Sequence, residues 1–166
     1  MQNVEIKDQS PHCSKHVLPL VVGGLTITCE DNMELMSRYP DNYFDLAIVD
    51  PPYGIGISSN PVRQQHQKKD WDSAIPTKEY FNELFRVSKN QIIWGGNYFD
   101  LPPSRGFFIW DKKQPHDFSL AMCEMAWSSI QKPAKMWSLS VLKEQNKIHP
   151  TQKPIQLYEW LLMNNA

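Results

Sequence analysis

Residues Leu46–Gly56 read LAIVDPPYGIG, and this stretch decides the expected fold. It continues an apolar run, Phe44–Val49, that only Asp45 interrupts, and the run stops at Asp50-Pro51-Pro52. Short apolar runs bounded by turn residues are typical of strands buried on both faces of a parallel sheet. We therefore expect DPPY to lie at the carboxyl end of such a strand, which is the edge where open α/β sheets bind ligands.

The rest of the sequence predicts further strands and helices, so the expected fold class is α/β. Asp31 and Glu34 form a D-x-x-E start signal for a short helix after a strand near Leu25–Cys29. Some of the late strands are expected to be antiparallel, and Asn60–Ser73 is expected to be a long loop. The other expected elements are helices at about Asn32–Arg38, Lys78–Val87 and after Pro154, and strands at Gln91–Trp94, Phe107–Trp110, Leu120–Trp127 and Met136–Val141.

Length and composition predict one globular domain. The chain has 166 residues, of which 41% are hydrophobic, and no stretch resembles a membrane span or a signal peptide. We expect a cytoplasmic protein without membrane contact, with a disordered leader at 1–20 and the folded domain at 21–166. The three cysteines lack CxxC spacing, and the His12, Cys13 and His16 cluster fits a polar leader better than a metal site. No metal is therefore predicted.

The charge balance limits how the protein could hold nucleic acid. There are 17 basic and 18 acidic side chains, giving a formal net charge of −1, which argues against binding mainly by the overall field. Any affinity for DNA must be local or weak. Arg63, Lys68 and Lys69 form one basic cluster that could contact DNA, although such clusters are often plain solvated surface.

The DPPY motif has the chemistry needed to handle an exocyclic amine on a base. Such an amine is a poor nucleophile because its lone pair is delocalised into the ring. Asp50 and the carbonyl of Pro51 could each accept an N–H, and Pro51 and Pro52 stiffen the backbone. Tyr53 offers a ring on which an extruded base could stack, worth about 1–3 kcal/mol per base. The alternative is a simple turn, but the preceding strand and following polar loop favour an active-site loop.

Five segments together resemble small phage-type DNA methyltransferases over about residues 25–166. In chain order they read LTITCEDNMELM, FDLAIVDPPYGIG, NQIIWGGNYF, FFIWDKKQ and KIHPTQKPIQLYEWLL. The resemblance implies a Rossmann-like class I methyltransferase sheet with the β-type motif order, in which DPPY is catalytic and HPTQKP leads into the S-adenosyl-L-methionine (AdoMet) pocket. It implies methylation of adenine N6 in double-stranded DNA, with cytosine N4 as an alternative.

The resemblance also assigns roles to individual residues. The catalytic set is Asp50, Pro51, Pro52 and Tyr53. The implied AdoMet contacts are Asp31, Asp50, His149, Thr151 and Lys153, although Asp31 could equally be a helix N-cap and HPTQKP could be a helix-entry turn. Both tryptophans in the substrate set could equally be core residues. The implied substrate contacts are Tyr53, Trp94, Asn97, Trp110, Asp111, Arg63, Lys68 and Lys69.

One part of the family pattern is missing. The family continues after the HPTQKP helix into a strand and a Gly-rich loop that cradles AdoMet, and none of the seven glycines here forms such a loop. We therefore expect an incomplete sheet that is marginal, rearranged or completed by another chain or a second copy, and a chain inactive alone. Alternatives are a non-catalytic subunit that binds DNA or a partner, or methylation of RNA or a protein glutamine. Zinc deamination is excluded because H-x-E and P-C-x-x-C are absent.

Overall fold

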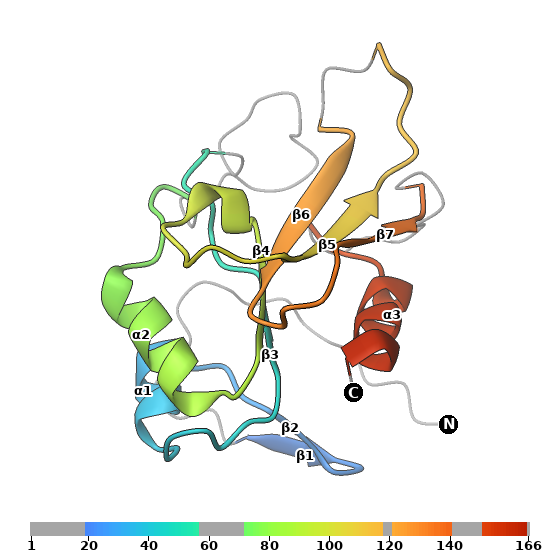
Figure 1. The fold of residues 1–166 in the computed structure, drawn as a ribbon. Coiled ribbons are helices and arrows are strands. Elements are labelled where there is room, and N and C mark those ends of the chain that lie inside the picture. Colours follow the sequence, from blue (N-terminus) through green and yellow to red (C-terminus); the bar gives the residue numbers. More distant parts are fainter. Residues whose placement is uncertain (1–18, 57–71, 118–120, 141–150, 166) are drawn as a thin grey trace.

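The computed structural model describes residues 19–56, 72–117, 121–140 and 151–165, and these form a mixed α/β fold (Figure 1). A five-stranded sheet has the order β3-β4-β6-β5-β7, and a separate hairpin contains β1 and β2. The strands are β1 (Leu20–Val22), β2 (Leu25–Ile27), β3 (Ala47–Val49), β4 (Gln91–Trp94), β5 (Gly106–Asp111), β6 (Cys123–Ser128) and β7 (Lys135–Ser138). The helices are α1 (Asn32–Ser37), α2 (Lys78–Val87), the 3-10 turn η3 (Gly96–Tyr98) and α3 (Ile155–Asn165).

The strand directions confirm the α/β expectation and the mixed character of the late strands. β3 pairs in parallel with β4, with Ile48 opposite Ile92. β6 runs antiparallel to both β4 and β5, and β7 is parallel to β5. The carboxyl ends of β3, β4, β5 and β7 therefore point to one edge of the sheet, and DPPY follows β3 at that edge.

Two expected strands are present, but their place in the sheets adds what the sequence did not predict. The DPPY strand, β3, packs against both apolar clusters, but it lies at the edge of the five-stranded sheet and is only half-buried. The predicted strand near Leu25 exists, but it pairs with the unpredicted β1 across Gly23-Gly24, with φ values of +57° and +84°. This hairpin is exposed, and it is not joined to the larger sheet within the described residues.

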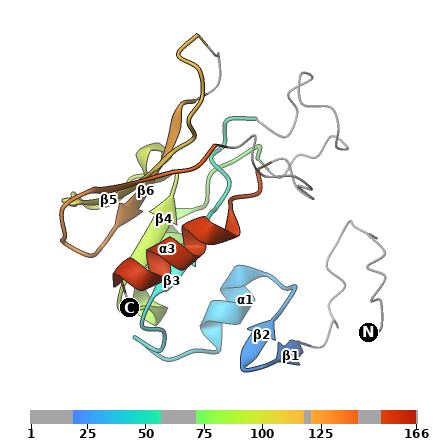
Figure 2. The same ribbon diagram turned by 90° about the vertical axis from the view of Figure 1, so that its right-hand side faces the viewer.

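The five-stranded sheet separates two apolar clusters, and helices cover both of its faces (Figures 1 and 2). Alternate residues of β4 point to opposite faces, as strand geometry requires. Ile93 joins the cluster that includes Phe81 and Leu84 of α2. Ile92 and Trp94 join the other cluster, which includes Leu157 and Leu161 of α3. Packing against β4 therefore fixes α3 and the segment that precedes it.

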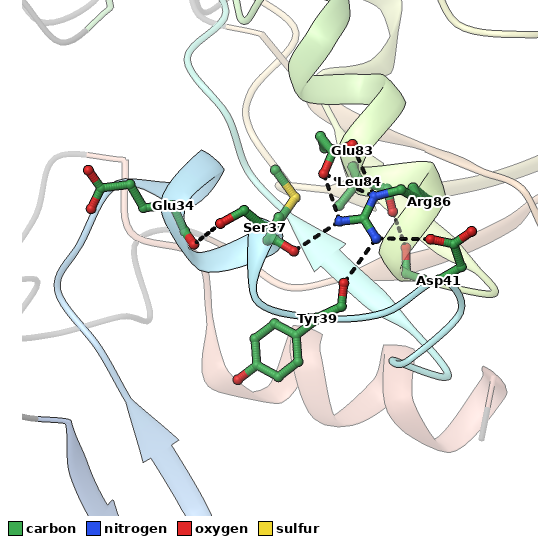
Figure 3. A network of polar contacts seen from close by, with 9 residues as sticks. Glu34, Ser37, Tyr39, Asp41, Glu83, Leu84 and Arg86 are labelled. Atoms are coloured by element: carbon green, nitrogen blue, oxygen red, sulfur yellow. Dashed lines mark hydrogen bonds and ion pairs between the residues drawn. The ribbon is translucent and has the colours of Figure 1, made fainter.

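Arg86 of α2 ties the end of α1 to α2 (Figure 3). Its guanidinium donates to the carbonyls of Met36 and Tyr39, at 3.0 and 2.9 Å, so it adds side-chain hydrogen bonds at the end of α1 and in the turn that follows. It also pairs with Glu83 at 2.8 Å and Asp41 at 3.0 Å. This network supports the helical layer beside β3.

Several predicted features lie outside the described residues. The expected leader is described only from Pro19, and the expected loop at Asn60–Ser73 only at its last two residues. In the part of the chain that is described, no helix is long and apolar enough to cross a membrane. Four predicted site residues also lie outside it: His149, Arg63, Lys68 and Lys69.

Candidate active site

The DPPY segment and the end of the HPTQKP segment meet in space. Lys153 Nζ lies 2.6 Å from Asp50 Oδ2, although the two residues are 103 positions apart. The Tyr53 hydroxyl donates to Asp50 Oδ1 at 2.7 Å, and Lys153 Nζ donates to the same hydroxyl at 3.3 Å. Asp50 follows β3 and Lys153 precedes α3, so the sheet and the docked helix bring these groups together.

Lys153 is a buried cation, because only 3% of its side chain is exposed. Its ammonium has a second carboxylate partner, Glu124 of β6, with Oε2 at 3.2 Å. The other oxygen of Glu124 binds Lys112 at 2.6 Å. Burying an ammonium is costly unless it is paired, and these contacts form a continuous chain of alternating charge from Asp50 to Lys112.

Aromatic rings surround the ammonium. Lys153 Nζ lies 5.1 Å from the ring centroid of the fully buried Trp94 and 5.8 Å from that of Tyr53. The Tyr53 ring stacks on Tyr98 of η3, with centroids 5.1 Å apart and planes inclined by 14°. Gly95 approaches Tyr53 so closely that a Cβ there would lie 2.3 Å from Tyr53 Cε1, and its φ of +68° also favours glycine.

Burial and the neighbouring charges keep the Tyr53 hydroxyl neutral and the Glu124 carboxylate ionised. Burial, followed by the charges of Asp50 and Glu124, raises the pKa of Tyr53 well above its usual range. Burial acts to raise the pKa of Glu124 as well, but the charges of Lys153 and Lys112 outweigh it and the pKa is lowered. Burial, with Asp50 and Glu124 adding to it, raises the pKa of Tyr158 to about 12. Tyr53 is therefore a hydrogen-bond donor and Glu124 an acceptor at neutral pH.

Asp72 anchors the DPPY turn from outside the motif. It is 1% exposed, and its Oδ1 accepts the backbone N–H groups of Tyr53 and Gly54, each at 2.9 Å. Hydrogen bonds to an ionised acceptor are stronger than neutral ones. Asp72 therefore fixes the backbone that carries the Tyr53 ring.

The substitution Asp72→Asn is expected to lower the free energy of unfolding by about 1–2 kcal/mol, because the amide oxygen accepts the same two N–H groups without the charge. Urea unfolding followed by circular dichroism measures the difference. Asp100→Asn, at an exposed carboxyl, is the matched control and should not change the urea midpoint of unfolding. Equal midpoints for the two variants would show that the charge on Asp72 contributes nothing.

A cavity of about 80 Å³ opens between these groups. Among the described residues, five of those predicted for the site line this cavity: Asp50, Pro51, Tyr53, Thr151 and Lys153. Three further described residues also line it and were not predicted from the sequence, namely Ile55, Asp72 and Glu124. Glu124 carried a signal that could have been used, since it is a carboxylate inside an otherwise apolar strand.

Asp31 lies elsewhere and acts as a helix cap. Its Oδ1 accepts the backbone N–H groups of Met33 and Glu34 at 2.8 and 3.3 Å, so it is the N-cap of α1. It does not line the cavity. The capping interpretation of Asp31 is confirmed, whereas its assignment to AdoMet remains a prediction.

Of the predicted substrate residues that the structure describes, Tyr53 lines the cavity, whereas Trp94, Asn97, Trp110 and Asp111 do not. Trp94 and Trp110 are both core residues, as the alternative interpretation has it, and the Trp110 indole N–H donates to the Leu139 carbonyl at 3.0 Å. Asp111 accepts the backbone N–H of Lys113 and the hydroxyl of Ser138. Asn97 is exposed on η3, and Pro52 is half-buried beside the site.

Comparison with known proteins assigns no family to this chain. No protein-family model matches the chain, and no curated protein matches it in a sequence search. The resemblance to DNA methyltransferases therefore depends on the motifs and on the contacts described above.

Proposed function

We propose that the Asp50 cavity binds the exocyclic amine of a base extruded from double-stranded DNA, and that the chain is the target-base part of an adenine-N6 DNA methyltransferase. The observation that carries the proposal is the meeting of DPPY and HPTQKP residues at one cavity, where Asp50, Tyr53 and Lys153 contact one another. A plain turn at DPPY would not require a buried lysine from a distant segment.

Asp50 retains the capacity to accept an amine. An ionised carboxylate has about four lone-pair positions. Tyr53 donates to Oδ1 and Lys153 donates to Oδ2, so each of these bonds uses one position on its oxygen. Asp50 can therefore still accept an incoming N–H. Pro51 also lines the cavity, and if its carbonyl accepts a second N–H, the two acceptors favour a tetrahedral amine nitrogen with its lone pair available for attack.

Tyr53 supplies the stacking surface, and Tyr98 occupies one face of it in this structure. Tyr98 is 44% exposed, so its ring has access to solvent and can be displaced. An extruded base that takes the place of Tyr98 would exchange one stacking contact for another of about 1–3 kcal/mol. This exchange lowers the cost of opening the site.

The described residues do not by themselves fit AdoMet, the methyl donor that the resemblance implies. The cavity of about 80 Å³ is smaller than the roughly 300–1,000 Å³ of typical ligand pockets, and Asp31 does not line it. The seven glycines include no loop of the family's Gly-rich type. We therefore propose that these 166 residues bind the base but do not transfer methyl on their own, and that a complementing chain supplies the rest of the AdoMet site.

The same observation favours a second candidate, a non-catalytic subunit that binds DNA or a methyltransferase partner. Calorimetric titration with AdoMet tests this second candidate. Micromolar binding by the 166-residue protein would count against the non-catalytic subunit, whereas no binding would agree with it. Cytosine N4 remains the alternative acceptor, because its amine presents the same hydrogens to Asp50.

The proposed role of Asp50 predicts a preference for an amine. Fluorescence anisotropy would compare duplexes that hold adenine or purine opposite an abasic site, where extrusion is least costly. The wild-type protein is expected to bind adenine about ten-fold more tightly than purine, since it gains a hydrogen bond to a charged acceptor. In Asp50→Ala this ratio should approach one. Equal binding of adenine and purine by the wild-type protein would refute the proposal.

Two further measurements complete this test. Asp45→Ala removes an exposed carboxyl near β3, where 88% of the side chain is accessible, and should leave the adenine-to-purine ratio unchanged. A transfer assay with tritiated AdoMet and unmethylated duplex DNA should show no methylation by this chain alone. Transfer that Asp50→Ala abolishes would show that the chain forms its own cofactor site.

A further inference from the structure

We infer that Lys153 donates a hydrogen bond to the ring nitrogen beside the target amine, so that the site selects bases whose amine-bearing carbon is bonded to an unprotonated ring nitrogen. The inference rests on the proposed function, because it assigns the neighbouring atom of the same base. It gives Lys153 a role in reading the base, whereas the family resemblance placed this residue near AdoMet.

The first argument is the pairing of an acceptor with a donor. Asp50 Oδ2 and Lys153 Nζ lie 2.6 Å apart, and both residues line the cavity. Adenine presents its amine beside N1, and cytosine presents its amine beside N3, so each offers a donor next to an acceptor. Hypoxanthine and thymine present a carbonyl oxygen beside an N–H, which would set acceptor against Asp50 and donor against Lys153.

The second argument concerns the hydrogens of Lys153. An ammonium has three N–H donors. Two of them face the carboxylates of Asp50 and Glu124, at 2.6 and 3.2 Å. The third faces the Tyr53 hydroxyl at 3.3 Å, which is beyond the usual range of a strong hydrogen bond. That hydroxyl already donates to Asp50, so a ring nitrogen can replace it as an acceptor without disrupting the motif.

The third argument is that Lys153 is held in place. Its side chain is 3% exposed and lies over the Trp94 ring, so it has little rotamer freedom left to lose on binding. Glu124 is the second carboxylate that binds the ammonium, and Lys112 binds Glu124. Glu124 is thus a positioning residue, which acts on the base through Lys153.

The test extends the abasic-site duplexes to four bases: adenine, 1-deazaadenine, purine and hypoxanthine. 1-Deazaadenine keeps the amine and replaces N1 with C–H. The wild-type protein should bind it about ten-fold more weakly than adenine, and hypoxanthine more weakly still. If adenine and 1-deazaadenine bound with equal affinity while purine bound more weakly, the role of Lys153 would be overturned but the proposed function would not. Equal affinities for adenine and purine would overturn the proposed function itself.

Variants identify the donor. In Lys153→Met the ratio of adenine to 1-deazaadenine affinity should approach one, and a ratio as large as in the wild-type protein would overturn the assignment. In Glu124→Gln this ratio should fall while the adenine-to-purine ratio persists, because only the positioning of Lys153 changes. Lys89→Met, at an exposed ion pair, should alter neither ratio. Each ratio compares two ligands on one protein, so partial unfolding of a variant does not change it.

Discussion

Replacing Lys153 with methionine is expected to lower the free energy of unfolding by about 3 kcal/mol. The methionine fills a similar volume but leaves Asp50 and Glu124 facing each other without their shared cation. This value is at the lower end for a broken buried pair, because the two carboxylate side chains are 31% and 26% exposed and keep some contact with water. Urea unfolding of the purified variant measures the loss.

Lys89→Met is the matched control for this prediction. Lys89 pairs with Asp45 at 2.6 Å, but the two side chains are 53% and 88% exposed. Exposed pairs contribute about 0–1 kcal/mol, so this variant should unfold close to the wild-type midpoint. Similar losses in the two variants would mean that burial of Lys153 does not matter.

The same substitution should change the pH dependence of stability. In the wild-type protein the pKa of Glu124 is lowered below 4.5, with Lys153 as the largest favourable charge. A lowered folded-state pKa contributes stability that is present above the unfolded value and is lost as the pH falls through the folded value. Without Lys153 the pKa of Glu124 should rise, so the variant should lose its stability at a higher pH. Acid titration followed by circular dichroism measures the midpoint.

The second large effect is expected from Leu161→Ala in α3, which should cost about 3 kcal/mol through the cavity that it creates. Leu161 is fully buried and joins the cluster that contains Ile92, Trp94 and Leu157. Since α3 begins two residues after Lys153, loosening this helix should also weaken binding of the adenine duplex.

Leu162→Ala provides a control on the same helix. Its side chain is 50% exposed, and surface substitutions usually change stability by less than about 0.5 kcal/mol. Thermal unfolding of the two variants, followed by circular dichroism, should therefore differ clearly. If both lost the same stability, α3 would not be docked through the Leu157 and Leu161 face.

Local sequence signals predicted most of the elements but not how they are arranged. β4 and α2 begin and end where expected, because an apolar run before Gly95-Gly96 and a periodic stripe bounded by Thr77 and Ser88 are local features. β1 was missed, although the Gly23-Gly24 pair is typical of a two-residue hairpin turn. The placement of β6 between β4 and β5 depends on distant pairing, which no local pattern encodes.

The residues of the candidate site could also be predicted only where a local motif marks them. Asp50, Tyr53 and Lys153 could be predicted because they belong to motifs with recognisable spacing. Asp72 could not be predicted, because its role is to accept two backbone N–H groups from residues 18 and 19 positions earlier in the chain. Contact of Lys153 with Asp50 depends on the docking of α3 against β4 and was not predicted either.

The separation of Asp50 from Lys153 also has a consequence for folding kinetics. Closing a loop of 103 residues costs about 4 kcal/mol of chain entropy from the (3/2)RT ln n relation, and the ion pair alone does not offset this cost. A contact between residues so far apart in the sequence becomes favourable only after the intervening strands have paired and α3 has packed. We expect the Asp50–Lys153 contact to form late, so the chemistry of the cavity would arise only in chains that have completed folding.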